Sequence, residues 1–452
     1  MPEELTDWQT DWEAFHARFA GLFGRSEPRA LCGAYLRGLM APLQRKSCWQ
    51  LAEEMGEALP DAMQRLLYRT PWDAEAARDL LQDFVWEQFG DLEGIGVVDE
   101  TGFVKSGRQS VGVKRQYTGT AGKVENCQVG VFLSYTSRHG HALLDRQLYL
   151  PEDWCEDASR RARAYVPQAM AFQTKPQLAL AMLRHAWARG APMRWVVGDE
   201  VYGNAAYFRQ AVSDHQRQYV LTVSVDTPVW VDRPAVEPAQ RRAGGRLRRK
   251  ARIAAEASAA TTVGEVVAGG PADGWERLTV AEGEKGPISH DWARQRVVES
   301  REGLPGQTVW LLARRSAEDP GEVAYYLSNA SAETPLLTLA QVAAARWTIE
   351  QCFREAKGET GLDRYQVRTW HSWHRHITLV MMAHAWLASV RRRAGEKGGT
   401  GRGQDLAESR PGRTHRRRGL RAAGLHPTAA SALRGTGRNL VPLAAPPTPT
   451  SP

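Results

Sequence analysis

Apolar residues recur at helical spacing through the first 90 residues of the chain. Intervals of three and four place such residues on one face of a helix, which the fold must then bury. They are Trp8, Trp12, Phe15, Phe19 and Leu22 in a first stripe, and Leu31, Tyr35, Leu36 and Leu39 in a second. The pattern predicts an all-α N-terminal domain over residues 1–92.

Two short helices are expected inside this domain, at residues 47–56 and 61–69, on either side of a break that ends at Pro60. A helix-turn-helix would place the second of them in the major groove of DNA. A plain helical bundle gives the same pattern, because helix-turn-helix motifs contain few obligatory residues. We weigh the two interpretations evenly and assign DNA binding to this domain as a hypothesis.

From residue 94 the pattern changes to short β-rich runs with helices between them. Strands are predicted at residues 94–99, 124–135, 142–150, 193–199 and 218–225, and a helix at 176–189. The runs GIGVVD (94–99) and MRWVVGD (193–199) are of the buried type, and each ends in an acid. This order predicts an α/β fold, in which a mixed sheet is flanked by helices on both faces.

Residues 226–335 interrupt this order with a predicted β-rich insertion. Strands are expected at residues 294–300, 307–314 and 323–329. Ahead of them stands a dense basic run, in which Arg248, Arg249 and Lys250 are candidates for contact with phosphates. A run of this kind is more commonly a solvated loop.

One long helix is predicted over residues 338–358, with Thr338 as its N-cap and Gly358 as its stop signal. A second helix is expected over residues 373–390. Beyond it Gly, Arg, Pro and Thr dominate and periodicity is lost, a composition that predicts disorder. The expected divisions after the N-terminal domain are therefore 93–225 and 336–390 for the two parts of a catalytic domain, 226–335 for the insertion and 391–452 for a basic tail.

The net charge of +8 does not by itself identify a fold that binds nucleic acid. Residues 391–452 contain 13 Lys and Arg but only 3 Asp and Glu, so the rest of the chain has slightly more acidic than basic residues. Local patches must therefore carry any argument for DNA binding.

Several classes of protein are disfavoured by the sequence. The five cysteines are far apart and never form a Cys-x-x-Cys pair, against a disulfide framework or a structural zinc site. No apolar run is long enough to cross a membrane, and the acidic N-terminus is unlike a signal peptide. No Walker-type phosphate loop is present, so ATP is not expected. We expect a cytoplasmic protein that has no membrane partner and associates with the nucleoid when it is bound to DNA.

Two of the predicted buried strands end in an aspartate, Asp99 and Asp199. Such strands deliver their last residues to the rim of a sheet, where the two carboxylates could meet. Adjacent carboxylates repel unless a cation lies between them, and hard oxygen ligands suit Mg²⁺ or Mn²⁺. Two such ions are the usual device for in-line displacement at phosphorus. Glu100 follows Asp99, but consecutive strand residues point to opposite faces, so at most one of the two faces the site.

A third carboxylate is available in the predicted helix 338–358. Arg346, Glu350 and Lys357 are spaced by four and seven residues, so they share one helical face. A glutamate between two cations fits a metal site beside a negatively charged polymer. An ordinary Arg–Glu–Lys surface ladder has the same spacing and is the commoner arrangement.

Three strings stand in order along the chain: VVDETGFVKSGRQSVGVKRQYTGTAGKVENCQVGVFLSY with LYLPEDW shortly after it, then WVVGDEVYGN, then RWTIEQCFREAKGETGLDRYQVR. Together they resemble the insertion-sequence transposases of the DDE superfamily, over residues 10–390. The resemblance implies a ribonuclease H-like catalytic fold with a β-rich insertion before the last acid. It also implies that Asp99, Asp199 and Glu350 are the catalytic acids and hold two Mg²⁺ or Mn²⁺ ions.

The resemblance further implies a homodimer that acts on double-stranded DNA, at the terminal inverted repeats of an element and at a target. The residues expected to contact DNA are Arg346, Lys357 and Lys105, besides Arg248, Arg249 and Lys250 in the basic run. The nearest branch of the family has a tyrosine where this chain has Ala343. The resemblance therefore does not extend to a step that forms a DNA hairpin.

Two other functions fit the same residues. A metal-dependent nuclease without strand transfer would use the same three acids. A catalytically inactive DNA-binding protein derived from a transposase would not need them, and their presence argues for an enzyme. The aromatic and histidine-rich segment 370–376 lacks the spacing of a closed zinc site. It fits aromatic packing, with Arg375 and His376 as further candidates for DNA contact.

Overall fold

The computed structural model describes residues 2–57, 59–241, 247–271, 274–283, 286–316 and 321–399. The chain divides into two units, of which the first includes the N-terminal residues up to Gly21 and the second runs from Leu22 to Gly401. The first unit contains α1 (Pro2–Arg18). Within the described residues, no helix combines the length and the apolar character that a membrane span requires.

The second unit begins with helices, as the apolar stripes predict. After the short 3₁₀ helix η1 (Ala20–Leu22), within which the division between the units falls, these are α2 (Ser26–Met40), α3 (Cys48–Glu54), α4 (Asp61–Tyr68) and α5 (Ala74–Phe89). Helices α2, α3 and α4 pack on one another, and α2, α4 and α5 also contact the long helix α14 (Trp370–Gly399). The two expected short helices are thus α3 and α4. Both the helix-turn-helix and the bundle interpretation of this pair remain predictions.

A mixed sheet follows, and its first part has the strand order β4–β3–β1–β5–β6. The strands are β1 (Ile95–Val104), β2 (Lys114–Thr118), β3 (Lys123–Ser137), β4 (Gly140–Tyr149), β5 (Trp195–Gly198) and β6 (Gln218–Val223). Strand β1 is antiparallel to β3 and parallel to β5, and β5 is parallel to β6. The predicted fold class, a mixed α/β sheet of ribonuclease H-like order with a helical N-terminal part, is confirmed.

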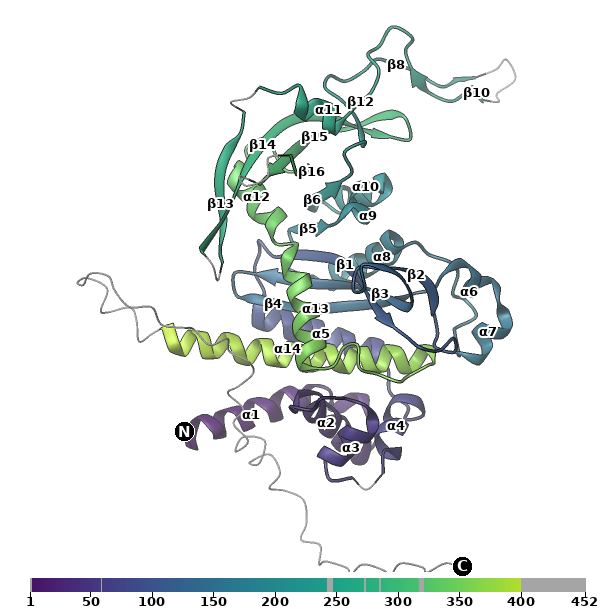
Figure 1. The fold of residues 1–452 in the computed structure, drawn as a ribbon, viewed down its shortest axis with the longest axis vertical. Helices are drawn as coiled ribbons and strands as arrows, with labels where there is room; N and C mark the ends of the chain where they lie inside the picture. Colours follow the sequence, from purple (N-terminus) through teal and green to yellow (C-terminus); the bar gives the residue numbers. More distant parts are fainter. Residues whose placement is uncertain are drawn as a thin grey trace, which may run out of the picture. The chain divides into compact units, whose positions relative to one another are not determined.

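Helices cover both faces of this sheet (Figure 1). On one face lie α13 (Trp347–Glu359) and α14, where Phe353 packs on Phe132 of β3 at 5.3 Å between ring centroids and Trp373 packs on Phe103 of β1 at 6.4 Å. The other helices are α6 (Glu152–Glu156), α7 (Ala158–Arg163), α8 (Lys175–Ala188), α9 (Glu200–Gly203) and α10 (Ala206–Asp214). Helix α8 contacts β3 and β4.

Most strands of the β-rich insertion extend the same sheet, whereas the short strands within residues 236–253 form two separate two-stranded sheets. Strand β16 (Val323–Ser328) pairs with β6, and β15 (Leu304–Arg315) and β14 (Gly286–Arg301) continue the sheet from there. The remaining elements are β7 (Pro228–Trp230), β8 (Val236–Glu237), β9 (Gln240–Arg241), β10 (Leu247–Arg249), β11 (Arg252–Ile253), β12 (Thr261–Thr262), α11 (Val263–Ala268) and β13 (Glu276–Gly283). A buried ion pair of 2.9 Å between Arg209 of α10 and Glu299 of β14 joins the two parts.

Strand β1 is longer than the sequence predicts. Its pairing with β5 stops at Val98 opposite Gly198, but its pairing with β3 continues to Val104. Asp99 therefore lies inside β1 and does not end it. The apolar run stops at Asp99 because only the part of β1 before it is covered by strands on both sides.

The predicted helix 338–358 is two helices. The first is α12 (Leu336–Ala344), with Pro335 as its N-cap instead of Thr338, and the second is α13. Between them the hydroxyl of Thr348 donates to the Ala345 carbonyl at 2.7 Å. Local bonds from threonine side chains compete with the regular helical pattern in this way.

Helix α14 runs past its predicted end at residue 390 to Gly399. Arg391 forms ion pairs with Glu355 at 2.5 Å and with Glu359 at 3.7 Å, both on α13. These contacts hold a segment that composition alone assigns to the tail. The rest of that predicted tail, residues 400–452, lies outside the described residues.

Candidate active site

Asp99 and Asp199 lie where the two parallel strands β1 and β5 part. The register pairs Val98 with Gly198, so each aspartate is the next residue after the last pair. Asp199 leaves the strand and becomes the N-cap of α9, where its carboxylate accepts a hydrogen bond from the Val201 amide at 2.9 Å. The strand pairing thus brings together two acids that are far apart in the sequence.

The pKa values of both aspartates are raised. Burial raises the pKa of Asp99 to about 8, and the negative charges of Asp199 and Glu100 act in the same direction. Burial and the charge of Glu100 raise the pKa of Asp199 to about 6. Full ionisation of this pair is therefore costly without a cation. Carboxylate oxygens that repel one another in this way suit a hard divalent ion, which would offset the repulsion.

Arg346, the N-cap of α13, contacts both Asp99 and Glu350. Its Nη2 atom lies 2.8 Å from Oε1 of Glu350, and its Nη1 atom lies 3.9 Å from Oδ2 of Asp99. The first contact is the one a surface ladder predicts. The second is not, because it reaches from the helix to the sheet. Helix α13 therefore brings Glu350 close to the edge where Asp99 lies.

Among the described residues, no group of three His, Cys, Asp or Glu side chains stands close enough to hold one metal ion. The cation that contacts both Asp99 and Glu350 in this arrangement is the guanidinium of Arg346. The roles of the three acids as metal ligands therefore remain predictions.

Glu100 points to the opposite face of β1, as the alternation of strand residues predicts. Its carboxylate accepts hydrogen bonds from Nζ of Lys175 at 2.5 Å and from the Tyr202 hydroxyl at 2.9 Å. Sequence reasoning missed both partners. They are 75 and 102 residues from Glu100, and no periodicity relates positions at such distances.

Lys357 lies two turns beyond Glu350 on α13. Its ammonium donates to the hydroxyls of Thr101 at 2.8 Å and Thr120 at 3.2 Å. Burial lowers the pKa of Lys357, and the charge of Asp363 opposes this effect. Within the part of the chain that the structure describes, Lys357 forms no ion pair, so it is not a rung of a surface ladder.

The other cations predicted to contact DNA lie elsewhere. Lys105 follows β1, with its ammonium 3.5 Å from the centre of the Tyr365 ring, and burial lowers its pKa to about 8. Arg248 and Arg249 belong to β10, which Figure 1 shows well away from β1 and β5. Their side chains lie outside what the structure describes. Lys250 is exposed.

Arg375 holds two elements together instead of facing outwards for DNA. Its guanidinium donates to the carbonyls of Leu67 at 3.1 Å and Trp72 at 2.9 Å. The histidine-rich segment around it packs as expected, with Trp373 and His374 buried. The aromatic interpretation of this segment therefore fits its place in the fold.

A model of the DDE superfamily endonucleases matches residues 18–287. A protein of Microchaete diplosiphon, named a probable transposase for insertion sequence element IS701, is 25% identical over 192 residues, or 41% of this chain and 46% of that protein. The match thus spans less than half of the relative's length. Among solved structures, a cryo-EM structure of the piggyBac transposase synaptic complex with hairpin DNA is similar over 83% of this chain and 68% of that chain. The sequence identity is 10% and the TM-score is 0.38, so this likeness carries no argument about function.

Proposed function

Because that family model covers more than half of its residues, the chain belongs to the DDE superfamily endonucleases, and we propose that it is a transposase that cuts and rejoins DNA at the ends of an insertion sequence. The observation that supports this most is the meeting of Asp99 and Asp199 where β1 and β5 part. The contact of Arg346 with both Asp99 and Glu350 adds the third acid.

The donors at this edge are of the kind that Mg²⁺ or Mn²⁺ prefers, and the three acids would have to approach one another to hold two such ions. The donors are carboxylate oxygens. The raised pKa values of Asp99 and Asp199 reflect first their burial and then the neighbouring negative charges, which a cation would offset. When bound, such ions activate the attacking oxygen and stabilise the leaving oxygen of the displacement. Glu350 would join the two aspartates as a ligand once Arg346 releases it.

The protein's own cations have separate tasks in this proposal. Arg346 can grip a phosphate with two parallel hydrogen bonds, whereas Lys357 acts as a point charge. Lys175 and Tyr202 hold Glu100 and so position β1 behind the aspartates. The partners would be duplex DNA with terminal inverted repeats and a target duplex. The enzyme would act as a homodimer on DNA, in the cytoplasm at the nucleoid.

The test uses DNA that carries the inverted repeats flanking the gene, with a second duplex as target, in Mg²⁺. The variants Asp99→Asn, Asp199→Asn and Glu350→Gln keep the side-chain size and remove the charge. Each is expected to lower cleavage by about 10³-fold or more, since a catalytic metal contributes several kcal/mol. Binding to the ends should persist. The control is Glu93→Gln, an exposed acid paired with Arg194 at the opposite end of β5.

The outcomes separate the three candidate functions. Cleavage followed by joining to the second duplex supports a transposase. Cleavage without joining would identify a nuclease. Binding without cleavage by the unaltered protein would identify an inactive DNA-binding protein. Cleavage near the unaltered rate by any of the three variants would remove that residue from the site.

A further inference from the structure

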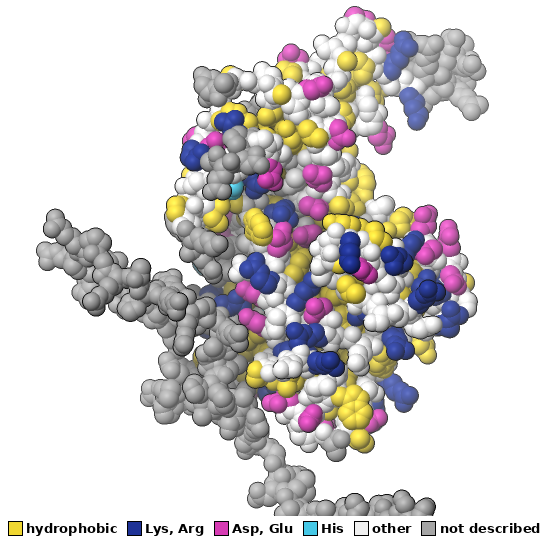
Figure 2. All heavy atoms as spheres, in the orientation of Figure 1, with side chains coloured by type: hydrophobic (Ala, Val, Ile, Leu, Met, Phe, Trp, Pro, Cys, Tyr) yellow, Lys and Arg dark blue, Asp and Glu magenta, His cyan; other side chains and the backbone are white. Residues whose placement is uncertain are grey.

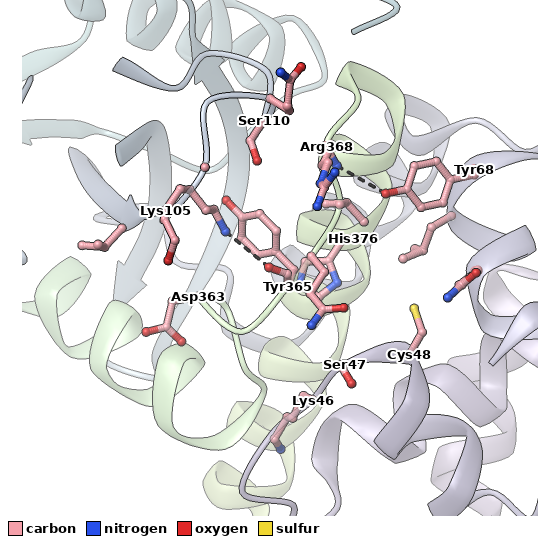
Figure 3. Close-up of a pocket in the computed structure, with 18 of the residues that line it drawn as sticks. Lys46, Ser47, Cys48, Tyr68, Lys105, Ser110, Asp363, Tyr365, Arg368 and His376 are labelled. Atoms are coloured by element: carbon pink, nitrogen blue, oxygen red, sulfur yellow. Dashed lines mark hydrogen bonds between the residues drawn. The ribbon is translucent and has the colours of Figure 1, made fainter. Parts of the chain in front are cut away.

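A cavity of about 810 Å³ lies between the N-terminal helices and the catalytic sheet, and none of the three acids lines it. Its walls come from three parts of the chain (Figure 3). Ser47 and Tyr68 come from the N-terminal helices, residues 105–110 follow β1, and residues 363–368 join α13 to α14. A second hollow of about 520 Å³ adjoins it and shares Ser47, Tyr365 and Gln366 with it. We call the two together the basic trough.

Unpaired positive charge is the first property of the basic trough. Arg45, Arg364 and Arg368 are exposed on its walls. Within the described residues, none of their guanidiniums forms a hydrogen bond or an ion pair. Figure 2 shows Lys and Arg side chains gathered on the surface over the C-terminal end of α13, from which this segment continues. The acid on the walls is Asp363, whose charge acts on Lys105 and Lys357.

Lys46 lines the trough but is not free to bind a ligand. Its ammonium donates to the backbone carbonyls of Leu39, Ala41 and Glu359. It therefore fastens the start of the trough to the end of α13. Lys105 is engaged in a similar way, because its ammonium donates to the Tyr365 carbonyl at 3.3 Å. The three arginines are left as the cations that face an incoming anion.

An exposed aromatic ring is the second property of the trough. The Tyr68 side chain is 43% exposed, and its hydroxyl accepts a hydrogen bond from the Arg368 amide at 3.3 Å. Tyr365 is held from behind, because its hydroxyl donates to Gln128 at 3.0 Å and accepts from Trp373 at 3.0 Å. His376 also lines the cavity. Tyr365 and His376 are buried, so Tyr68 is the ring on these walls that is open to a base. An exposed ring among cations is typical of sites for unpaired nucleotides, which stack their bases and place their phosphates on the cations.

The size of the cavity decides which form of DNA can enter it. A cavity of about 810 Å³ lies in the range of pockets that hold small molecules, about 300–1,000 Å³. An intact duplex, whose major groove alone is about 12 Å wide, cannot be enclosed in it. A few unpaired nucleotides can.

We infer that the basic trough binds unpaired nucleotides of a DNA strand, with phosphates at Arg45, Arg364 and Arg368 and a base against Tyr68. The inference rests on the proposed function, because it concerns the strand that is cut. Lys105 follows Asp99 by six residues, so at about 3.3 Å per residue the trough begins about 20 Å from the acids. A strand that leaves the acids along β1 therefore reaches the trough after a few nucleotides.

The test measures binding of two fluorescein-labelled probes, dT12 and a blunt duplex of about 12 base pairs, across a salt series. The full chain is used with the background change Asp99→Asn, so that no cleavage interferes. The triple variant Arg45→Gln, Arg364→Gln and Arg368→Gln is expected to bind dT12 at least tenfold more weakly. Its salt slope should fall by about 2, at about 0.7 for each lost phosphate contact on a single strand. Binding of the duplex should change less than twofold.

The matched control is Arg194→Gln, which removes an exposed arginine at the start of β5 that is paired with Glu93. It should leave both probes unaffected. A second readout replaces one thymine of dT12 by 5-iodouracil and maps photocrosslinks. Tyr68 should be crosslinked, and Tyr68→Leu should lose the crosslink and weaken dT12 binding while the melting temperature is kept. This variant also tests the inference if the triple variant fails to fold.

The outcomes keep the inference apart from the proposed function. Unchanged binding of dT12 by the triple variant, or an equal loss on duplex and dT12, would overturn the inference even if the enzyme cuts and joins DNA. Conversely, the trough variants could lose dT12 binding and the Tyr68 crosslink although the unaltered protein cuts nothing. The binding of unpaired nucleotides in the trough would then stand, whereas the transposase proposal, and with it the assignment to the strand that is cut, would fall.

Discussion

Asp99 on β1 and Asp145 on β4 are largely buried carboxylates of the same sheet, but the charges around them differ. Asp145 is contacted by two arginines, Arg78 at 2.9 Å and Arg146 at 3.5 Å. Asp99 stands among acids, with the single guanidinium of Arg346 at 3.9 Å. Burial raises the pKa of both carboxyl groups.

In this protein, burial therefore does not distinguish a structural acid from a functional one. The distinction lies in whether nearby positive charges balance the charge of the carboxylate. Around Asp145 the network closes, because Arg146 also pairs with Glu75 at 2.9 Å and Arg78 pairs with it at 3.2 Å. In such a network each carboxylate is paired with an arginine, so none of them is left to bind a cation. The excess of negative charge around Asp99 leaves room for a cation, and uncompensated groups of this kind cluster at functional sites.

The largest expected effect on stability comes from removing one arginine of the ion-pair network around Asp145. Arg78→Met leaves Asp145 as a buried charge without its closest partner, and we expect the free energy of unfolding to fall by about 3–5 kcal/mol. Asp99→Asn removes a charge that repels its neighbours, so it should not destabilise the protein. Urea unfolding measures both. The double variant Arg78→Met with Asp145→Leu should recover most of the loss, and a cost below about 1 kcal/mol for Arg78→Met alone would contradict the contrast.

The two regions should also respond to pH with opposite signs. Burial, together with the charge of Arg146, lowers the pKa of His374 to about 3. Between that value and the usual 6.5, the unfolded chain binds more protons than the folded one. Stability should therefore fall as the pH is lowered through this window, by up to about 1.4 kcal/mol per unit. His374→Gln should flatten this slope.

For Asp99 the sign is reversed. Its folded pKa of about 8 lies above the unfolded value of 3.8, so its contribution is most favourable below pH 3.8 and is lost as the pH rises through about 8. Urea midpoints between pH 5 and 9 for the unaltered protein, His374→Gln and Asp99→Asn measure both slopes. His139→Gln, at an exposed histidine, is the control. Equal slopes in all four proteins would refute the assignment.

A smaller effect is expected from divalent ions. Mg²⁺ at ten times its dissociation constant should stabilise the folded protein by about 1.4 kcal/mol through binding alone. The melting temperature should rise by about 3–6 °C, if about 2–4 °C corresponds to each kcal/mol. The shift should disappear in Asp99→Asn and be kept in Asp145→Asn, whose own melting temperature will be lower. The same shift in Asp99→Asn as in the unaltered protein would exclude the acids as the ion site.

The smallest effect concerns the two cations on α13. Lys357→Ala and Arg346→Ala should each reduce the salt slope of binding to duplex ends by about one unit, at about 0.9 for each phosphate contact. A surface ladder predicts only a few tenths of a kcal/mol of stability and no change in DNA binding. Lys357→Ala is the clearer test of the two, because within the described part of the chain Lys357 donates only to the hydroxyls of Thr101 and Thr120. Its removal, unlike that of Arg346, leaves no acid without its partner there. Unchanged slopes in both variants would leave Arg346 and Lys357 without a role on DNA.

Much of the fold could be predicted from local pattern. The apolar runs before Asp99 and Asp199 predicted β1 and β5, because burial between two strands requires apolar residues on both faces. Three strings in order identified the superfamily, and the match of its model over residues 18–287 confirms that assignment. Helix α8 was placed within one residue at each end, since its apolar face and its N-cap are both local signals.

Features that depend on distant partners were not predicted. The five residues of β1 beyond Asp99 are a strand because β3 pairs with them. The insertion joins the catalytic sheet because β16 finds the free edge of β6. Residues 391–399 are helical because Arg391 pairs with acids on α13. None of these partners is near in sequence, so no local pattern could reveal them.

By itself, the sequence determined the superfamily and which acids stand at the ends of its buried runs, because both depend on the order and the nature of neighbouring residues. Only the tertiary structure decided how those acids are surrounded. It brings Arg346 to both Asp99 and Glu350, holds Glu100 with Lys175, and opens a trough between helices and sheet. Charge compensation is a matter of distances of a few ångströms in space, and the chain sets those distances only when strands and helices far apart in sequence have packed.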